Sequence, residues 1–506
     1  MVLTGVSRVM GYVRTFVFAY FFGHTGMADV INAVFRIPES LRMLFAEGAL
    51  SSAFIPTLST ALVEDASGER ARAIVRNLIG FILAALVPLC VLGVVFNRQL
   101  VGLLIHFNDP QMMAMAEELF PYVIWFILTI SLSAVLMGAL NARHRFGVPA
   151  ITPILFSLTV IASVIWLPVA LPYRMIIGIV TGGLAQVVFQ LPAFLRARYS
   201  ARPDFRFNNQ DFKRVLVQWL PVVFSASIFA VNTLIANMFA TGLEPGSVSA
   251  LQYAVIYFQL PIGIFANSVI TVLFPRLSRQ AALNDSAGLK ETLRYGLRFM
   301  LLLLIPSTLL LVFLGEDLIG LTLQHGAFTR AGTLQTNPVL TGFSLGLFST
   351  GALYLFQRLF YALKDYRRPL LGAGLIMVVD VGLSLVLKET PLRVTGLALA
   401  NSIAFSVGVV FFVFLARRRL GLLGLRRLVL SSFRVVAGNI PLGLIIAAYL
   451  LWVRPAAAGL PFIPRFLVLG GVALAGFGVT IVMYLVLKID IIKDILKERF
   501  RRTGRT

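Results

Sequence analysis

The chain has 506 residues, of which 58% are hydrophobic and only 13% are charged, and it carries a formal net charge of +22. Soluble globular domains are about 25% charged, so the composition indicates an integral membrane protein. The basic residues lie at the ends of apolar segments and not on a soluble face, which excludes a nucleic-acid-binding surface, and the single cysteine, Cys90, excludes a disulfide framework and a thiolate metal cluster.

Apolar segments of about 20 residues, long enough to cross a bilayer as helices, recur along the whole chain. They predict an all-α protein with fourteen transmembrane helices, at 2–22, 29–63, 76–96, 117–141, 150–170, 174–196, 214–240, 247–274, 296–314, 337–363, 369–387, 395–416, 432–452 and 464–487.

The basic residues set the orientation of these helices. Most of the 44 lysines and arginines fall in alternate loops and in the carboxy-terminal tail, at 64–76, 141–149, 195–214, 275–298, 362–370, 416–434 and 488–506. Because basic loops stay in the cytoplasm, we expect both termini on the cytoplasmic side.

The second predicted span, 29–63, is longer than one membrane crossing needs. A straight helix of that length would reach about 50 Å, whereas the hydrocarbon core is about 30 Å thick. Pro38, Gly48 and Pro56 lie inside it and predict a bent or broken helix. Broken helices that carry polar residues line the cavities of transporters. A straight helix that protrudes into water is the alternative.

The two halves of the chain resemble each other at a nearly constant shift of about 220 residues. The matched segments are 54–59 with 273–278, 142–149 with 362–369, and 194–198 with 414–418. Three matches in order indicate a duplicated unit of six spans with the same topology in both copies. We therefore expect an amino-terminal lobe at 1–196, a cytoplasmic linker at 197–213, a carboxy-terminal lobe at 214–416, and two additional helices with a basic tail at 417–506.

Five arginines lie inside the apolar segments: Arg8, Arg14, Arg36, Arg42 and Arg358. A cation near the bilayer centre is unfavourable by a few kcal/mol or more, so such residues face a wet, protein-lined cavity and mark function. Their charge indicates an anionic ligand, and the planar guanidinium fork suits phosphate.

The arginines differ in the roles that we predict for them. Arg14 lies near mid-span, on one helical stripe with Ser7 and Gly11, and we favour ligand binding for it and for Arg42. Arg36 is better explained as an ion-pair partner of Glu39.

Glu47 fits either role. Arg8 lies nearer the cytoplasm, where snorkelling to the membrane surface is the alternative. For Arg358, snorkelling, pairing with Asp365 and cavity lining all stay open.

No P-loop, nucleotide site or catalytic nucleophile motif is found, which favours a secondary transporter over an enzyme. Two facing six-helix lobes suit alternating access. No cofactor is expected. Asp380 lies deep in the carboxy-terminal lobe, where it predicts either a sodium or proton site with Asn232 and Thr395 or a capped structural aspartate.

Five segments carry a recognisable pattern: 7–14 (SRVMGYVR), Asp29, 36–56 (RIPESLRMLFAEGALSSAFIP), 324–328 (QHGAF) and 358–365 (RLFYALKD). On these segments the chain resembles the MurJ family of bacterial lipid II flippases, and the resemblance covers nearly the whole chain. It implies the fold of the multidrug/oligosaccharidyl-lipid/polysaccharide exporter (MOP) superfamily, with the helix pair 432–487 forming a groove for the polyprenyl tail. It also implies substrate-binding roles for Arg8, Arg14, Asp29 and Arg42.

The chain departs from the family pattern on the eighth span. Ile256 stands where the family carries an arginine, and Gln259 stands near the expected acidic residue. Three explanations stay open: the amino-terminal lobe binds the pyrophosphate alone, Tyr257 and Gln259 add neutral hydrogen bonds, or the substrate differs.

The resemblance implies a role in peptidoglycan and cell-wall synthesis, and hence in cell shape. The expected activity is transfer of lipid II across the bacterial cytoplasmic (inner) membrane, driven by the membrane potential, with lipid II, membrane lipids and the cell-wall machinery as partners. The alternatives are a flippase for another polyprenyl-linked glycan, a cation-coupled drug antiporter and a non-transporting scaffold. The intramembrane arginines count against the antiporter, which needs an acidic cavity.

Overall fold

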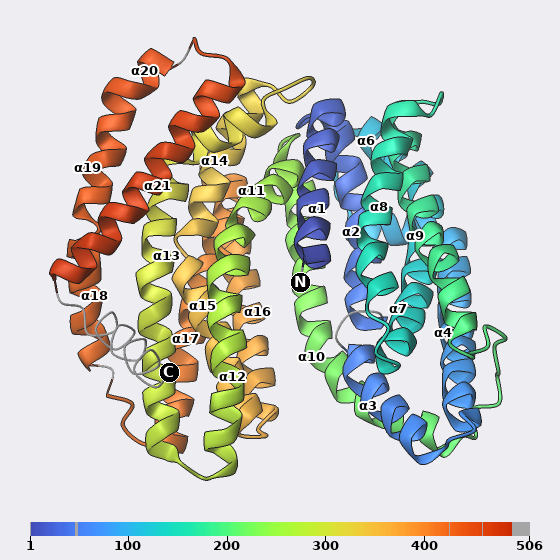
Figure 1. The fold of residues 1–506 in the computed structure, drawn as a ribbon. Helices are drawn as coiled ribbons and strands as arrows, with labels where there is room; N and C mark the ends of the chain where they lie inside the picture. The colour runs from blue at the N-terminus through green and yellow to red at the C-terminus, as the bar shows by residue number, and fades with distance from the viewer. Residues whose placement is uncertain (1, 46–48, 425, 458, 488–506) are drawn as a thin grey trace. The chain divides into compact units, whose positions relative to one another are not determined.

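The computed structural model describes residues 2–45, 49–424, 426–457 and 459–487, and regular structure in these ranges is entirely helical (Figure 1). Contacts between Cα atoms divide the chain into two compact units. The first comprises Met1–Ser249 and His325–Thr329, and the second comprises Ala250–Gln324 and Arg330–Thr506. The boundaries that the sequence predicts for the two lobes and the linker, at 1–196, 197–213 and 214–416, stay a prediction.

The first unit contains ten helices in its described part, several of which end where glycine, proline or a charged turn interrupts the apolar sequence. They are α1 (Val2–Phe22), α2 (Gly26–Phe45), α3 (Ala49–Glu64), α4 (Glu69–Val95), α5 (Asn97–Leu104), α6 (Pro110–Val123), α7 (Phe126–Ala142), α8 (Gly147–Trp166), α9 (Leu171–Arg196) and α10 (Gln210–Thr241).

The chain continues through α11 into the helices of the second unit. These are α11 (Ser247–Pro261), the π-helical turn η1 (Ile262–Ala266), α12 (Asn267–Ala282), α13 (Ser286–Leu323), α14 (Arg330–Ser344), α15 (Leu347–Ala362), α16 (Arg367–Leu387), α17 (Arg393–Leu420), α18 (Arg426–Gly438), α19 (Ile440–Ala448), the π-helical turn η2 (Tyr449–Val453), α20 (Arg454–Ala457) and α21 (Phe462–Val486).

Ten helices of the described residues are long and apolar enough to cross a membrane, and the bent pair α14 and α15, with 44° between its halves, makes an eleventh. The chain is therefore a multi-pass membrane protein. Each predicted span overlaps one or more helices of the structure, and the number of fourteen crossings stays a prediction. Helices α1, α2, α3, α5 and α10 fall outside this set, in part because α1 and α2 carry the intramembrane charges and α5 has only eight residues.

The long second span predicted at 29–63 corresponds to two helices. Helix α2 runs through Pro38 as far as Phe45, and α3 begins at Ala49 and contains Pro56. Residues 46–48, where Glu47 and Gly48 fall, lie outside the described part of the chain.

The helix boundaries follow the same shift as the sequence repeat. His144 follows the end of α7 in the left-handed conformation, with φ 57°, and Lys364 does so after α15, with φ 56°. The α6–α7 break at residues 124–125 matches the α14–α15 break at 345–346. These chain reversals occur at matching positions of the two halves of the sequence, and the duplicated unit of six spans stays a prediction.

The segment that follows α9 is attached to α4 by polar contacts. The side-chain amide of Asn77 donates to the carbonyls of Asp204, at 3.2 Å, and Arg206, at 3.0 Å. Arg70 forms two hydrogen bonds with Asp211 at the start of α10. In the turn before α4, the Ser67 hydroxyl and then the Arg70 backbone N–H hold the pKa of Asp65 below its ordinary value. The contacts of Asn77 and Arg70 hold the segment between α9 and α10 against α4.

The last helices of the second unit pack on α13 (Figure 1). One apolar cluster joins Leu314 and Leu321 of α13 to Leu442, Ile446, Tyr449 and Leu469. Nearby, the Asn439 amide donates to the Tyr484 hydroxyl at 2.6 Å, and that hydroxyl donates to the Leu302 carbonyl at 3.4 Å. Helices α18, α19 and α21 thus use α13 as their packing partner.

Candidate functional site

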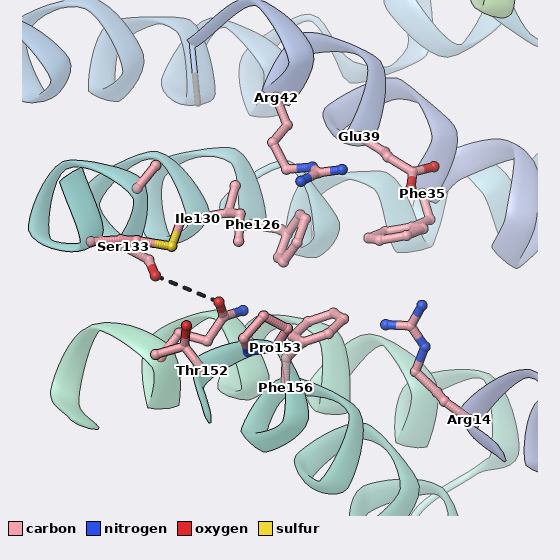
Figure 2. Close-up of a pocket in the computed structure, with 13 residues that line it drawn as sticks. Arg14, Phe35, Glu39, Arg42, Phe126, Ile130, Ser133, Thr152, Pro153 and Phe156 are labelled. Atoms are coloured by element: carbon pink, nitrogen blue, oxygen red, sulfur yellow. Dashed lines mark hydrogen bonds between the residues drawn. The ribbon is translucent and has the colours of Figure 1, made fainter. Parts of the chain in front are cut away.

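A pocket of about 270 Å³ lies among five helices of the first unit (Figure 2). Its walls are Arg14 from α1; Phe35, Glu39 and Arg42 from α2; Phe126, Ile130, Ser133, Ala134 and Met137 from α7; Thr152, Pro153 and Phe156 from α8; and Gln186 from α9. The structure thus brings together Arg14 and Arg42, the two residues for which the sequence favoured ligand binding.

Arg14 reaches the pocket because α1 packs against α8. Its guanidinium carbon lies 5.0 Å from the centre of the Phe156 ring, a cation–π contact. Among the described residues no carboxylate forms an ion pair with it. Figure 2 shows the guanidinium groups of Arg14 and Arg42 directed into the same space. A ligand that enters this space meets two cations.

The predicted ion pair between Arg36 and Glu39 is confirmed. The Arg36 nitrogen lies 2.9 Å from the Glu39 carboxylate, one turn apart on α2. Two arginines and one glutamate line the pocket, and that glutamate is already paired with Arg36. The pocket is therefore electropositive and suits an anion.

The wall opposite Arg14 carries neutral polar groups that the sequence analysis did not single out. Ser133, Thr152 and Gln186 line this end, and Gln190 lies buried behind them. In the sequence these residues could have been found as amide and hydroxyl side chains within otherwise apolar spans. The sequence analysis considered only charged side chains there and missed them.

Asp29 does not line this pocket. It is buried on α2, where its carboxylate accepts hydrogen bonds from the backbone N–H of Gly246, at 2.6 Å, and of Ser249, at 2.8 Å. These groups lie where α11 begins, so Asp29 caps the first turn of that helix. The structure gives Asp29 a structural partner, and its role in substrate binding stays a prediction.

Three other candidates of the first unit lie outside the pocket or outside the described residues. Arg8 is exposed on α1 and Ser7 is half-buried, and neither belongs to the pocket wall. Glu47 falls in the part of the chain that the structure does not describe. The substrate-binding role of Arg8 stays a prediction.

The candidates around the eighth span lie on α11. Tyr257 is buried, and its hydroxyl is hydrogen-bonded to that of Thr322. Gln259 is exposed and Ile256 is half-buried. None of the three belongs to the pocket wall.

Arg358 is exposed on α15, with its guanidinium carbon 5.6 Å from the Phe274 ring centre and 5.9 Å from that of Tyr361. Asp365, its predicted partner, instead pairs with Arg368 at 3.0 Å. An interfacial position on aromatic rings fits the snorkelling alternative better than the pairing alternative.

Asp380 is buried on α16 and accepts hydrogen bonds from the Asn401 amide, at 3.0 Å, and the Ser384 hydroxyl, at 3.5 Å. Thr395 lies in the same unit as Asp380, whereas Asn232 lies in the first unit. No cluster of three or more histidine, cysteine or acidic residues suited to a metal occurs in the described ranges. The predicted cation site stays a prediction.

The model of the family described as "Lipid II flippase MurJ" matches residues 18–468. This chain belongs to the MurJ family. A probable lipid II flippase MurJ of Borreliella burgdorferi is 32% identical over 420 residues, which cover 83% of this chain and 82% of that protein. A second, from Rhizobium meliloti, is 31% identical over 416 residues, covering 79% of this chain and 76% of the relative.

Solved structures agree with this family at the level of the fold. A lipid II flippase MurJ in an inward closed conformation matches 98% of this chain and 99% of its own, with a TM-score of 0.76 and 24% identity. An inward-facing MATE multidrug transporter of the MOP superfamily matches 82% of this chain and 95% of its own, with a TM-score of 0.68 and 13% identity. The chain thus has the MurJ and MATE type of fold. Its membership of the MurJ family makes it a transporter rather than an enzyme.

Proposed function

We propose that this protein moves lipid II, the polyprenyl-pyrophosphate-linked peptidoglycan precursor, from the inner to the outer leaflet of the bacterial cytoplasmic membrane. Membership of the MurJ family supports lipid II as the substrate. The observation that carries the proposal is the pocket of the first unit, in which Arg14 and Arg42 face one space.

The chemistry of the pocket suits a pyrophosphate. Each guanidinium can donate two parallel hydrogen bonds to phosphate oxygens and keeps its charge when water is excluded. The Phe156 ring packs on the Arg14 guanidinium. Since Glu39 is already paired with Arg36, an incoming anion does not have to displace a carboxylate from Arg14.

The architecture that we propose has fourteen spans, both termini in the cytoplasm, and two six-helix lobes that alternate in exposing the pocket to either side. The polyprenyl tail stays in the lipid, along a groove of the helix pair 432–487. An inside-negative potential of 100 mV favours the outward movement of each negative charge by about 2.3 kcal/mol. The same field favours return of the emptied, positive pocket toward the inside. Components of the cell-wall machinery are further proposed partners.

Complementation of a bacterial strain depleted of its own lipid II flippase tests this proposal. The wild-type chain should restore growth, and Arg14→Ala and Arg42→Ala should each fail, because loss of a charge-assisted phosphate contact lowers affinity by about 10- to 100-fold. Arg98→Ala is the matched control, since that arginine side chain is 84% exposed at the end of a helix. Rescue by either pocket variant at normal membrane levels would contradict the proposal.

A flippase for a different polyprenyl-linked glycan is the second candidate, because Ile256 replaces the arginine that the family pattern predicts. The Ile256→Arg variant distinguishes the two. If lipid II is the substrate and the first unit binds the pyrophosphate alone, this variant should complement no better than the wild type. A gain of lipid II transport on adding the arginine would favour the different glycan for the natural chain. A drug antiporter is disfavoured by the electropositive pocket, which repels cationic drugs.

A further inference from the structure

The pocket has two chemically distinct ends. Figure 2 shows Arg14 at one end and Ser133 and Thr152 at the other, with aromatic side chains between them. The pyrophosphate of the proposed substrate would bind at the cationic end, beside Arg14. No part of the substrate has yet been assigned to the neutral end, beside Ser133 and Thr152. The volume of about 270 Å³ is slightly below the range of about 300–1,000 Å³ for pockets that enclose a drug-sized ligand. It is therefore too small for a whole glycopeptide head group, and it suits a pyrophosphate together with part of the adjoining sugar.

A directed chain of hydrogen bonds fixes the polarity of the neutral end. The Gln190 amide nitrogen donates to the Ser133 hydroxyl at 2.7 Å and to the Ser133 carbonyl at 3.3 Å. Because the Ser133 oxygen accepts from Gln190, its own proton is directed to the side-chain oxygen of Gln186, 3.5 Å away. The Gln186 amide then has its oxygen occupied and its NH₂ group left as a donor. No residue of the described ranges accepts a hydrogen bond from that NH₂ group.

Thr152 supplies the opposite polarity. Its hydroxyl donates to the Pro149 carbonyl of its own helix at 2.8 Å, which leaves the oxygen lone pairs as acceptors. Thr152 and Gln186 are both buried, at 1% and 5% exposure, and both contribute to the pocket wall. At the pocket wall the Gln186 NH₂ group can still donate and the Thr152 oxygen can still accept, so the two side chains can bind a complementary group of the ligand.

We infer that Gln186 and Thr152 form a subsite for the acetamido group of the amino sugar next to the pyrophosphate. A secondary amide offers one carbonyl oxygen and one N–H, which match the Gln186 NH₂ group and the Thr152 oxygen. Ser133 and Gln190 act as positioning residues that hold Gln186 in the donor orientation. This inference rests on the proposed function and names the part of the head group that the pocket recognises.

The test compares two lipids that share the polyprenyl pyrophosphate but differ at carbon 2 of the attached sugar, one carrying N-acetylglucosamine and the other glucose. Binding of each to the purified full-length protein in lipid nanodiscs is measured. The wild type should prefer the N-acetylated lipid by about tenfold, the effect of one to two neutral hydrogen bonds. Gln186→Leu and Thr152→Val should each reduce this preference to about threefold or less, because each should weaken the N-acetylated lipid more than the glucose lipid.

Two further variants make the result specific. Thr181→Val is the matched control for Thr152→Val, because Thr181 also bonds to its own helix backbone but is exposed on α9. It should keep the full preference. Arg14→Ala should weaken both lipids equally, because it acts on the shared pyrophosphate.

Each remaining outcome overturns the inference. Equal weakening of both lipids in Gln186→Leu, or a preference that persists in both subsite variants, would show that the polar end only supports the fold. A wild type that binds both lipids without a preference would remove the subsite but leave the proposed function intact. A wild type that binds neither lipid would contradict the proposed function, and the subsite with it.

Discussion

Arg14 and Asp29 are both charged residues within the amino-terminal helices, yet their surroundings differ. Arg14 lies on the face of Phe156 and borders the pocket, where its hydrogen-bond donors remain available to a ligand. The Asp29 carboxylate is already bonded to two backbone N–H groups at the start of α11. A charge that retains donors toward a pocket can bind, whereas a charge whose acceptors are occupied mainly stabilises the fold.

Replacing Arg14 by lysine tests whether geometry or charge alone is required at that position. Lysine keeps the positive charge but loses the planar fork that binds two phosphate oxygens at once. We expect Arg14→Lys to retain about a tenth of the lipid II transport of the wild type, consistent with the loss of one charge-assisted hydrogen bond. Transport into proteoliposomes measures it, and full activity would show that the charge alone suffices.

Asp29→Ala should lower stability by about 1–2 kcal/mol, the effect expected for loss of a helix cap. Asp29→Asn retains one side-chain oxygen as an acceptor and should lower the stability by less than Asp29→Ala. Thermal unfolding in detergent compares the two variants. If Asp29 also binds substrate, Asp29→Asn will lose transport while unfolding near the wild-type temperature. Parallel losses of stability and transport would assign the residue to capping alone.

Helix α13 is the element on which the second unit is organised. It runs from Ser286 to Leu323, and it packs against α14, α15 and the additional helices α18, α19 and α21. Near its end Glu316 and Asp317 both contact Arg454, at 2.7 and 3.0 Å, and Glu316 also pairs with Arg330 of α14. These ion pairs attach the additional helices to α13 at one end of the apolar cluster.

Arg454→Met should weaken this attachment and keep most of the side-chain volume. Because the three side chains are partly exposed, we expect a loss of about 1–2 kcal/mol, between the values for exposed and buried pairs. Thermal unfolding of the purified protein measures it, and Arg98→Met is the control, because Arg98 also contacts a glutamate but is largely exposed. Equal unfolding temperatures for the two variants would contradict a role for Arg454 in holding the helices together.

At the scale of the whole molecule, each unit has its own packed core, and the pocket lies entirely within the first. All thirteen residues that line it belong to that unit, so the electropositive site does not depend on the arginine that Ile256 replaces. Binding of the pyrophosphate by the first unit alone is one of the three explanations that the sequence left open, and it stays a prediction.

The proposed transport cycle predicts a dependence on the membrane potential. An inside-negative potential imposed on proteoliposomes by a potassium gradient should accelerate outward movement of lipid II. Up to about 2.3 kcal/mol is available per elementary charge moved through 100 mV. An inside-positive potential of the same size should slow it. Transport rates that do not change with the imposed potential would contradict potential-driven transport.

Much of this protein could be predicted from the sequence because membrane insertion constrains local sequence strongly. The bilayer requires long apolar helices, so each predicted span overlaps one or more helices of the structure. The Arg36–Glu39 pair was predictable too, because residues three apart on a helix are neighbours. The repeat and the family pattern were equally visible in the order of the residues.

The tertiary structure decided which polar groups share a site. Arg14, Thr152 and Gln186 lie on different helices, and only the packing of α1, α8 and α9 places them around one pocket. Asp29 matched the family's charged positions, yet its carboxylate is used by backbone groups more than 200 residues further along the chain. Local sequence determines which segments are helical, because each helix satisfies its own backbone. The partners of a side chain depend on how those helices pack, which no local pattern specifies.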